Sequence, residues 1–166
     1  MDKQKRTDIN EKRRKRMISI IIIAVIAIIV LWLFTPLGYF HVRPEGEYQM
    51  NLTINGEIYT ATMENNSSAS ALRHLLKWGP KTVHMRDYGG MEKVGMLWKG
   101  LPSNNMDLTT EPGDLVLFMG SSFVVYYNSN HWNFTKLGHI NDVTHEELKQ
   151  IFGDGDVTIT LSLQKE

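Results

Sequence analysis

A continuous apolar run over residues 17–34 constrains this chain most, because Ser19 is its only polar side chain. Thirteen of its eighteen residues are Ile, Val, Leu or Phe. As a helix the run rises about 1.5 Å per residue and spans roughly 27 Å, close to the thickness of a bilayer's hydrocarbon core. Lipid offers the backbone no hydrogen-bond partners, so we expect a transmembrane helix. The alternative is a buried helix of a soluble core, which the length and uniform apolarity of the run disfavour.

The charges on either side of this run predict its orientation. Residues 1–16 carry eight Lys or Arg against three acidic residues, whereas the residues just after the run include a single basic one, Arg43. Because basic flanks stay in the cytoplasm, we expect a cytoplasmic arm (1–16) and an extracytoplasmic remainder on a single-pass membrane protein. A cleaved signal peptide is the competing interpretation. Signal peptides usually have a shorter apolar region, roughly 7–15 residues, and a small-x-small cleavage site, which is missing here.

Composition constrains the rest of the chain, after the membrane segment. Residues 35–47 contain two Pro and two Gly without an apolar period, which predicts a short linker. Residues 48–166 are long enough for one domain with its own core. From residue 17 onward there are ten basic and fifteen acidic residues, a balance that argues against a nucleic-acid partner. The chain has no cysteine, which excludes disulfides and fits a bacterial cell envelope better than disulfide-rich secretion.

A period of two dominates residues 48–166 and predicts β-strands. The expected strands are alternating or short apolar segments bounded by turn residues, and they cover 50–54, 58–63, 83–85, 115–119, 123–127, 132–137 and 157–163. Asn55-Gly56 predicts a two-residue hairpin turn, and Pro112-Gly113 predicts a type II turn. Residues 95–105 follow no regular pattern, because Gly and Pro interrupt them.

Two helices interrupt the strands. One of residues 65–67 caps the first helix, which ends before Gly79. Thr144 and Glu147 form a capping box that begins the second, and Gly153 ends it. About eight strands are enough to close into a barrel with a filled interior, with the helices at its open ends. We therefore expect a mainly β domain, a closed eight-stranded antiparallel barrel with two helices, in addition to the transmembrane helix.

Four short motifs follow one another through this domain. They are Leu101-Pro102, Gly113-Asp114-Leu115, Tyr126-Tyr127 and Thr135-Lys136-Leu137-Gly138-His139-Ile140. With the order of the elements, they resemble a small bacterial cyclophilin-like domain family that has the cyclophilin fold. The resemblance covers the domain and leaves out the arm and the anchor.

The proline site of true cyclophilins has no clear counterpart in this chain. Its signature, F-H-R-[IV]-I-P-G-F-M-x-Q-G-G, is most nearly approached by residues 83–91, with Arg86 in the place of the arginine. Trp132 is a candidate for the place of a cyclophilin aromatic residue. Glu92 and Lys93 follow where cyclophilins have their apolar floor, and we expect a charged, flexible pair there to hydrate the site and to weaken catalysis.

Three functions remain open at this level. The favoured one is a binding module that holds a peptide or a small ligand beside the membrane; the expected anchors are Arg86, Tyr88, Trp98 and Trp132. The second is an extracytoplasmic prolyl isomerase, which requires Arg86 to be partly buried in an apolar groove. The third is a scaffold domain with an apolar surface patch in place of a pocket. We expect no cofactor, and no metal either, since the six histidines include no pair at metal-ligand helical spacing.

Overall fold

The computed structural model describes residues 17–26 and 44–164. The chain divides into two compact units, Met1–Pro36 and Leu37–Glu166. In the first unit residues 17–26 are helical, as expected for the start of the apolar run. Residues 27–34 of the predicted span, the arm 1–16 and most of the linker 35–47 lie outside the described residues. Within the described ranges no helix has both the length and the apolarity needed to cross a membrane.

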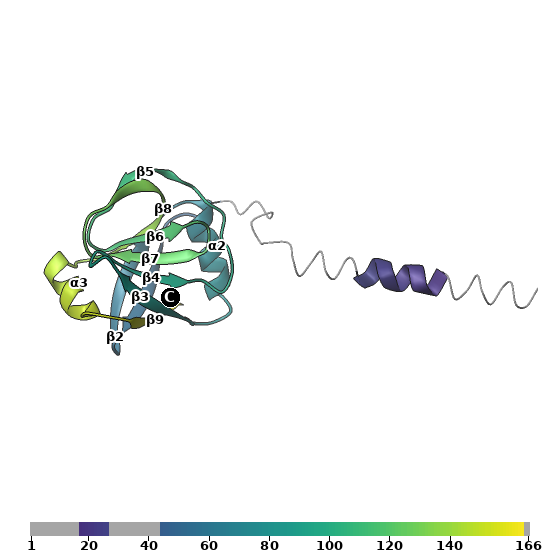
Figure 1. The fold of residues 1–166 in the computed structure, drawn as a ribbon, viewed down its shortest axis with the longest axis horizontal. Helices are drawn as coiled ribbons and strands as arrows, with labels where there is room; N and C mark the ends of the chain where they lie inside the picture. Colours follow the sequence, from purple (N-terminus) through teal and green to yellow (C-terminus); the bar gives the residue numbers. More distant parts are fainter. Residues whose placement is uncertain (1–16, 27–43, 165–166) are drawn as a thin grey trace, which may run out of the picture. The chain divides into compact units, whose positions relative to one another are not determined.

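Over its described residues, 44–164, the second unit contains nine strands and two helices (Figure 1). The strands are β1 (Tyr48–Ile54), β2 (Glu57–Met63), β3 (Lys81–Tyr88), β4 (Glu92–Met96), β5 (Met106–Thr109), β6 (Asp114–Phe118), β7 (Ser122–Tyr126), β8 (His131–Ile140) and β9 (Val157–Leu163). The helices are α2 (Ser67–Leu76) and α3 (His145–Phe152). Figure 1 shows them on either side of the strands.

Eight of the strands close into an antiparallel barrel. Their order is β2-β1-β9-β3-β4-β7-β6-β8, and the pairing of β8 with β2 closes the circuit. The first and last strands are neighbours, with Leu52 opposite Leu161. The predicted closed eight-stranded barrel is therefore confirmed. β5 is a ninth strand that pairs with the first half of β8 outside the circuit, at the top of Figure 1.

Local sequence signals account for the turns and the helix ends. Asn55 and Gly56 both have positive φ, 52° and 89°, as a type I′ hairpin requires. Asn66 caps α2, its Oδ1 accepting a 2.9 Å hydrogen bond from the amide of Ala69. Thr144 and Glu147 form the predicted capping box of α3. These predictions are confirmed, because each depends on residues close together in sequence.

Two strands, β4 and β5, were not predicted. β4 begins with Glu92 and Lys93 and contains Gly95, so it lacks the apolar alternation of a half-buried strand. Gly95 is needed there because a Cβ atom would lie 2.5 Å from Cγ1 of Val83 on the paired strand. The irregular region expected at residues 95–105 therefore begins only after Met96. Tertiary pairing, and not local pattern, makes this segment a strand.

Apolar side chains form two clusters, one inside the barrel and one outside. The barrel interior holds the larger cluster, which includes Leu52, Leu115 and Leu161. The smaller cluster consists of Val116, Val124, Tyr126 and Phe134, with the half-buried Val94 and Leu108 packed against it. Because successive residues of a strand face opposite sides, this second cluster lies on the outer face of β4, β7 and β6. The outer cluster positions the candidate site.

Candidate functional site

Backbone pairing places two rows of side chains on the outer face of β3, β4 and β7. One row consists of Tyr88, Glu92 and Tyr126, and the adjacent row consists of Arg86, Val94 and Val124. Paired residues point to the same face of a sheet, so each row presents three adjacent side chains outward. The first half of β8 adds Trp132 and Phe134 where it leaves the barrel to pair with β5.

These elements enclose a cavity of about 440 Å³, which we call the outer groove. It is lined by Tyr88, Glu92, Val94, Phe118, Ser122, Val124, Tyr126, Asn130, Trp132 and Phe134. The aromatic rings of its floor are packed: the centroid of Phe134 lies 5.6 Å from that of Tyr126 and 6.3 Å from that of Phe118. Tyr88 and Trp132 remain 66% and 62% exposed and form the rim. The groove thus has a fixed apolar floor and an accessible aromatic rim.

Glu92 places a carboxyl group among these rings. The residue is 9% exposed, and its Oε2 atom has no hydrogen-bond partner. In residues 17–26 and 44–164, this Oε2 atom is the only buried side-chain oxygen or nitrogen without a hydrogen-bond partner. Burial raises the pKa of Glu92, and hydrogen bonding with the Tyr126 side chain opposes that rise.

Tyr126 is the polar neighbour of Glu92 in the groove. Its hydroxyl accepts a 3.3 Å hydrogen bond from Nδ2 of Asn130. Burial, together with the hydrogen bond to Glu92, raises the pKa of Tyr126 well above its usual range. The phenol therefore stays protonated at physiological pH and acts as a hydrogen-bonding group, not as a base.

The structure brings only some of the predicted anchors together. Tyr88 and Trp132 both line the outer groove. Arg86 is exposed and lines a neighbouring hollow of about 800 Å³ over β3, β4 and β9, which Tyr88 also borders. Trp98 lines neither hollow, and its ring lies 5.9 Å from Nζ of Lys81. The predicted anchors therefore do not form a single site.

Lys93 corrects the expectation of a hydrated charged pair. Its side chain is 0% exposed, and Nζ donates to Oδ1 of Asp87 at 2.8 Å and to the carbonyl oxygens of Gly153 and Gly155 at 3.0 and 2.7 Å. Glu92 is also buried, on the opposite face of the same strand. The expectation was wrong because strand alternation separates the two charges and the fold buries each of them.

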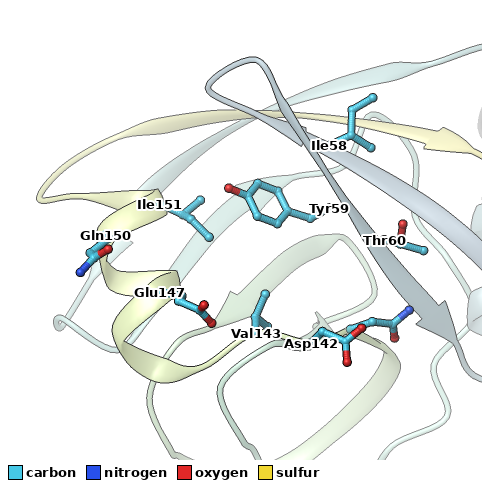
Figure 2. A pocket seen from close by; sticks show the side chains of 9 residues that line it. Ile58, Tyr59, Thr60, Asp142, Val143, Glu147, Gln150 and Ile151 are labelled. Carbon is cyan, nitrogen blue, oxygen red and sulfur yellow. The ribbon is translucent and has the colours of Figure 1, made fainter.

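A further pocket, of about 420 Å³, lies between β2 and α3 (Figure 2). Figure 2 shows Tyr59 pointing from β2 toward Ile151 of α3. Two of the polar side chains that line the pocket have partners: the Tyr59 hydroxyl donates to Glu57 at 2.7 Å, and Glu147 belongs to the capping box of α3. The pocket lies where α3 packs against β2. In the described ranges no group of three or more His, Cys, Asp or Glu side chains is placed to hold a metal ion.

The closed barrel with its two helices is the fold expected of a cyclophilin-like domain. Residues 52–162 match the sequence profile of the Cyclophilin-like family, and the chain belongs to that family. A hypothetical protein from Archaeoglobus fulgidus, known from a solution structure, superposes with a TM-score of 0.54 at 12% identity, over 75% of this chain and 100% of that one. At that identity the likeness concerns the fold alone. No curated protein matches this chain.

Phe118 was not predicted to line the groove, and Glu92 was expected to be hydrated, not buried among aromatic rings. One signal was available. Residues 115–118 and 123–127 are apolar at consecutive positions, a pattern typical of strands covered on both faces. It indicates that β6 and β7 carry a second apolar layer outside the barrel. The sequence has no comparable signal that Glu92 lies in this layer, because a charged residue at a turn normally faces solvent.

Proposed function

We propose that this chain is a membrane-anchored, extracytoplasmic binding protein that holds a peptide or small ligand in the outer groove. The observation that carries the proposal is the aromatic-lined cavity of about 440 Å³ outside an already filled barrel core. Ligand sites usually have volumes of about 300–1,000 Å³ and combine apolar walls with a few polar groups. The exposed rings of Tyr88 and Trp132 provide the contact area at the entrance.

The membrane part of the proposal rests on the sequence. The apolar run 17–34 has the length of a span, and the basic arm before it favours a cytoplasmic N-terminus. A linker of thirteen residues reaches at most about 45 Å, so the domain works close to the membrane surface.

The test is a titration of the full chain in zwitterionic nanodiscs with 2-phenylethanol, followed by NMR. A probe this small is expected to bind in about the millimolar range. Ser122→Trp fills the outer groove and is expected to abolish binding. The matched control Thr158→Trp fills the neighbouring hollow instead and should leave binding unchanged. Binding that survives Ser122→Trp, or that is lost only with Thr158→Trp, would contradict the proposed site.

Prolyl isomerisation is not the function that this geometry supports best. An isomerase needs a cationic donor that faces the twisted amide inside an apolar groove, whereas Arg86 is exposed and lines the neighbouring hollow. We expect the full chain to give little or no acceleration in an NMR exchange assay with an Xaa-Pro peptide. Strong catalysis that disappears in Arg86→Ala would overturn this ranking.

A further inference from the structure

The aromatic content of the outer groove points to the charge of its ligand. Five of its ten lining residues are aromatic: Tyr88, Phe118, Tyr126, Trp132 and Phe134. The face of an aromatic ring carries the negative part of its quadrupole and attracts cations within about 6 Å. Such a lining stabilises a positively charged group more than a neutral or an anionic one.

Glu92 adds the only formal charge among the lining residues. An unpaired carboxyl oxygen in an apolar environment destabilises the folded domain, and an apolar side chain at position 92 would avoid that cost. Oε2 is shielded from solvent, so a group that reaches it from the groove must displace a neighbouring side chain. The side chains of Tyr88 and Trp132 are mostly exposed, and a rotation of either ring would widen the access to the Glu92 carboxyl.

The basic residues of the adjacent strand segments do not neutralise this carboxyl. Lys93, next in sequence, points into the barrel and donates to Asp87. Arg86 on β3 is paired with Val94 and lines the neighbouring hollow. None of the ten groove residues is Lys, Arg or His. The groove therefore presents a hydrogen-bond acceptor and negative ring faces without an opposing cation among its own side chains.

Building on the proposed function of the outer groove, we infer that its ligand carries a primary ammonium or guanidinium group on an apolar body. The cationic group donates to Oε2 of Glu92, and the apolar body packs on Val94, Val124 and Phe134. A lysine or arginine side chain of a peptide and a free organic amine share this chemistry.

The experiment compares three probes with the same phenyl body and different head groups. These are phenethylamine, 2-phenylethanol and phenylacetate, titrated at pH 7.5 against the full chain in zwitterionic nanodiscs. We expect phenethylamine to bind on the order of tenfold more tightly than 2-phenylethanol, and phenylacetate to bind most weakly. Glu92→Gln keeps the shape of the side chain and removes its charge, and should reduce the preference for the amine to within about twofold. Glu57→Gln removes an exposed carboxylate that does not line the groove and should leave the preference intact.

A second pair of probes distinguishes the two sources of the cation. Acetyl-Gly-Lys-Phe-amide is compared with acetyl-Gly-Gln-Phe-amide and with phenethylamine. Tighter binding of the Lys peptide than of phenethylamine assigns the cation to a peptide side chain, and the reverse order assigns it to a free amine. Either order of affinity supports the inference, provided that the difference in affinity disappears in Glu92→Gln. Equal binding of the Lys and Gln peptides contradicts a peptide source.

The melting temperature separates a binding role of Glu92 from a structural one. Because the buried carboxyl is unfavourable, Glu92→Gln should melt at the same or a higher temperature than the parent. Equal affinity for all three phenyl probes, with 2-phenylethanol still displaced by Ser122→Trp, would overturn this inference and leave the proposed function standing. Failure of every probe to bind would overturn both. A Glu92→Gln protein that melts several degrees lower and binds all three probes equally poorly would assign the carboxyl a structural role.

Discussion

Two neighbouring residues of opposite charge, Glu92 and Lys93, have different roles in this domain. Lys93 is fully buried, and its ammonium group joins Asp87 to the chain segment between α3 and β9. The Tyr127 hydroxyl donates to the same Asp87 oxygen. All three donors of the ammonium group are thereby used, which offsets the cost of burying its charge. Lys93 therefore acts as an internal cross-link, whereas Glu92 leaves an acceptor unpaired.

We expect Lys93→Met to lower the free energy of unfolding by roughly 3 kcal/mol, because it leaves the Asp87 carboxylate without its cationic partner and two carbonyl oxygens without their donor. Urea denaturation of the full chain, followed by circular dichroism, measures this loss. Lys149→Met removes a charge from the exposed face of α3 and should change stability by less than about 0.5 kcal/mol. Equal stabilities of the two variants would contradict the cross-link.

Asp114 predicts how stability depends on pH. Burial alone would raise its pKa, but hydrogen bonds with His139 and Lys136, both at 2.8 Å, outweigh that effect and hold the pKa below its ordinary value. A carboxyl with a lowered folded-state pKa stabilises the fold above its unfolded pKa, about 3.9. That contribution is lost as the pH falls through the lower folded-state value.

We therefore expect the free energy of unfolding to fall as the pH is lowered from about 5 to 2, and Asp114→Asn to reduce the slope of that fall. Urea titrations at several pH values provide the measurement. Asp142→Asn, at an exposed turn, is the control and should keep the slope of the parent. An unchanged slope in Asp114→Asn would show that this carboxyl is not a source of the acid sensitivity.

At the scale of elements, the junction of β2 and β8 closes the barrel. Gly138 pairs with Met63 there, and a Cβ atom at this position would lie 2.5 Å from the carbonyl oxygen of Thr62 and 2.8 Å from Sδ of Met63. β8 also pairs with β6 in its second half and with β5 in its first half. The same strand thus closes the barrel and supplies Trp132 to the groove.

A methyl group at Gly138 should push β2 and β8 apart. We expect Gly138→Ala to cost about 1–3 kcal/mol of stability, as overpacking usually does. Gly100→Ala is the control, because its Cβ would meet nothing closer than the Gly120 carbonyl oxygen at 3.6 Å. Equilibrium unfolding of both variants is the measurement, and a Gly138→Ala protein as stable as the control would mean that the junction is looser than described.

At the scale of the whole molecule, the proposed function requires a domain held outside the cytoplasm. Protease added to intact cells should then release a fragment that begins within residues 35–47, while a tag placed before residue 1 stays protected. N-terminal sequencing of the released fragment provides the measurement. Recovery of the free domain without added protease would identify residues 17–34 as a signal peptide. Protection of the domain from added protease would show that the orientation is opposite to the predicted one.

The sequence by itself determined seven of the nine strands, the turns and the helix caps, because each depends on periodicity or on residues near one another in the chain. Asn66, Thr144 and the Asn55-Gly56 turn are examples. The closed barrel was predicted from the number of strands and from the family resemblance. The apolar run 17–34 likewise predicts a membrane environment for itself. Only its first part, residues 17–26, lies within the described residues.

Only the tertiary structure decided which residues form the candidate site. Of the four predicted anchors it placed Tyr88 and Trp132 in the outer groove, left Arg86 in the neighbouring hollow and placed Trp98 in neither. It made a strand of Glu92–Met96 against its local pattern and buried Glu92 among aromatic rings from β6, β7 and β8. A groove formed by segments far apart in the chain depends on which strands pair and on which face each side chain points to, and neither is encoded in the spacing of nearby residues.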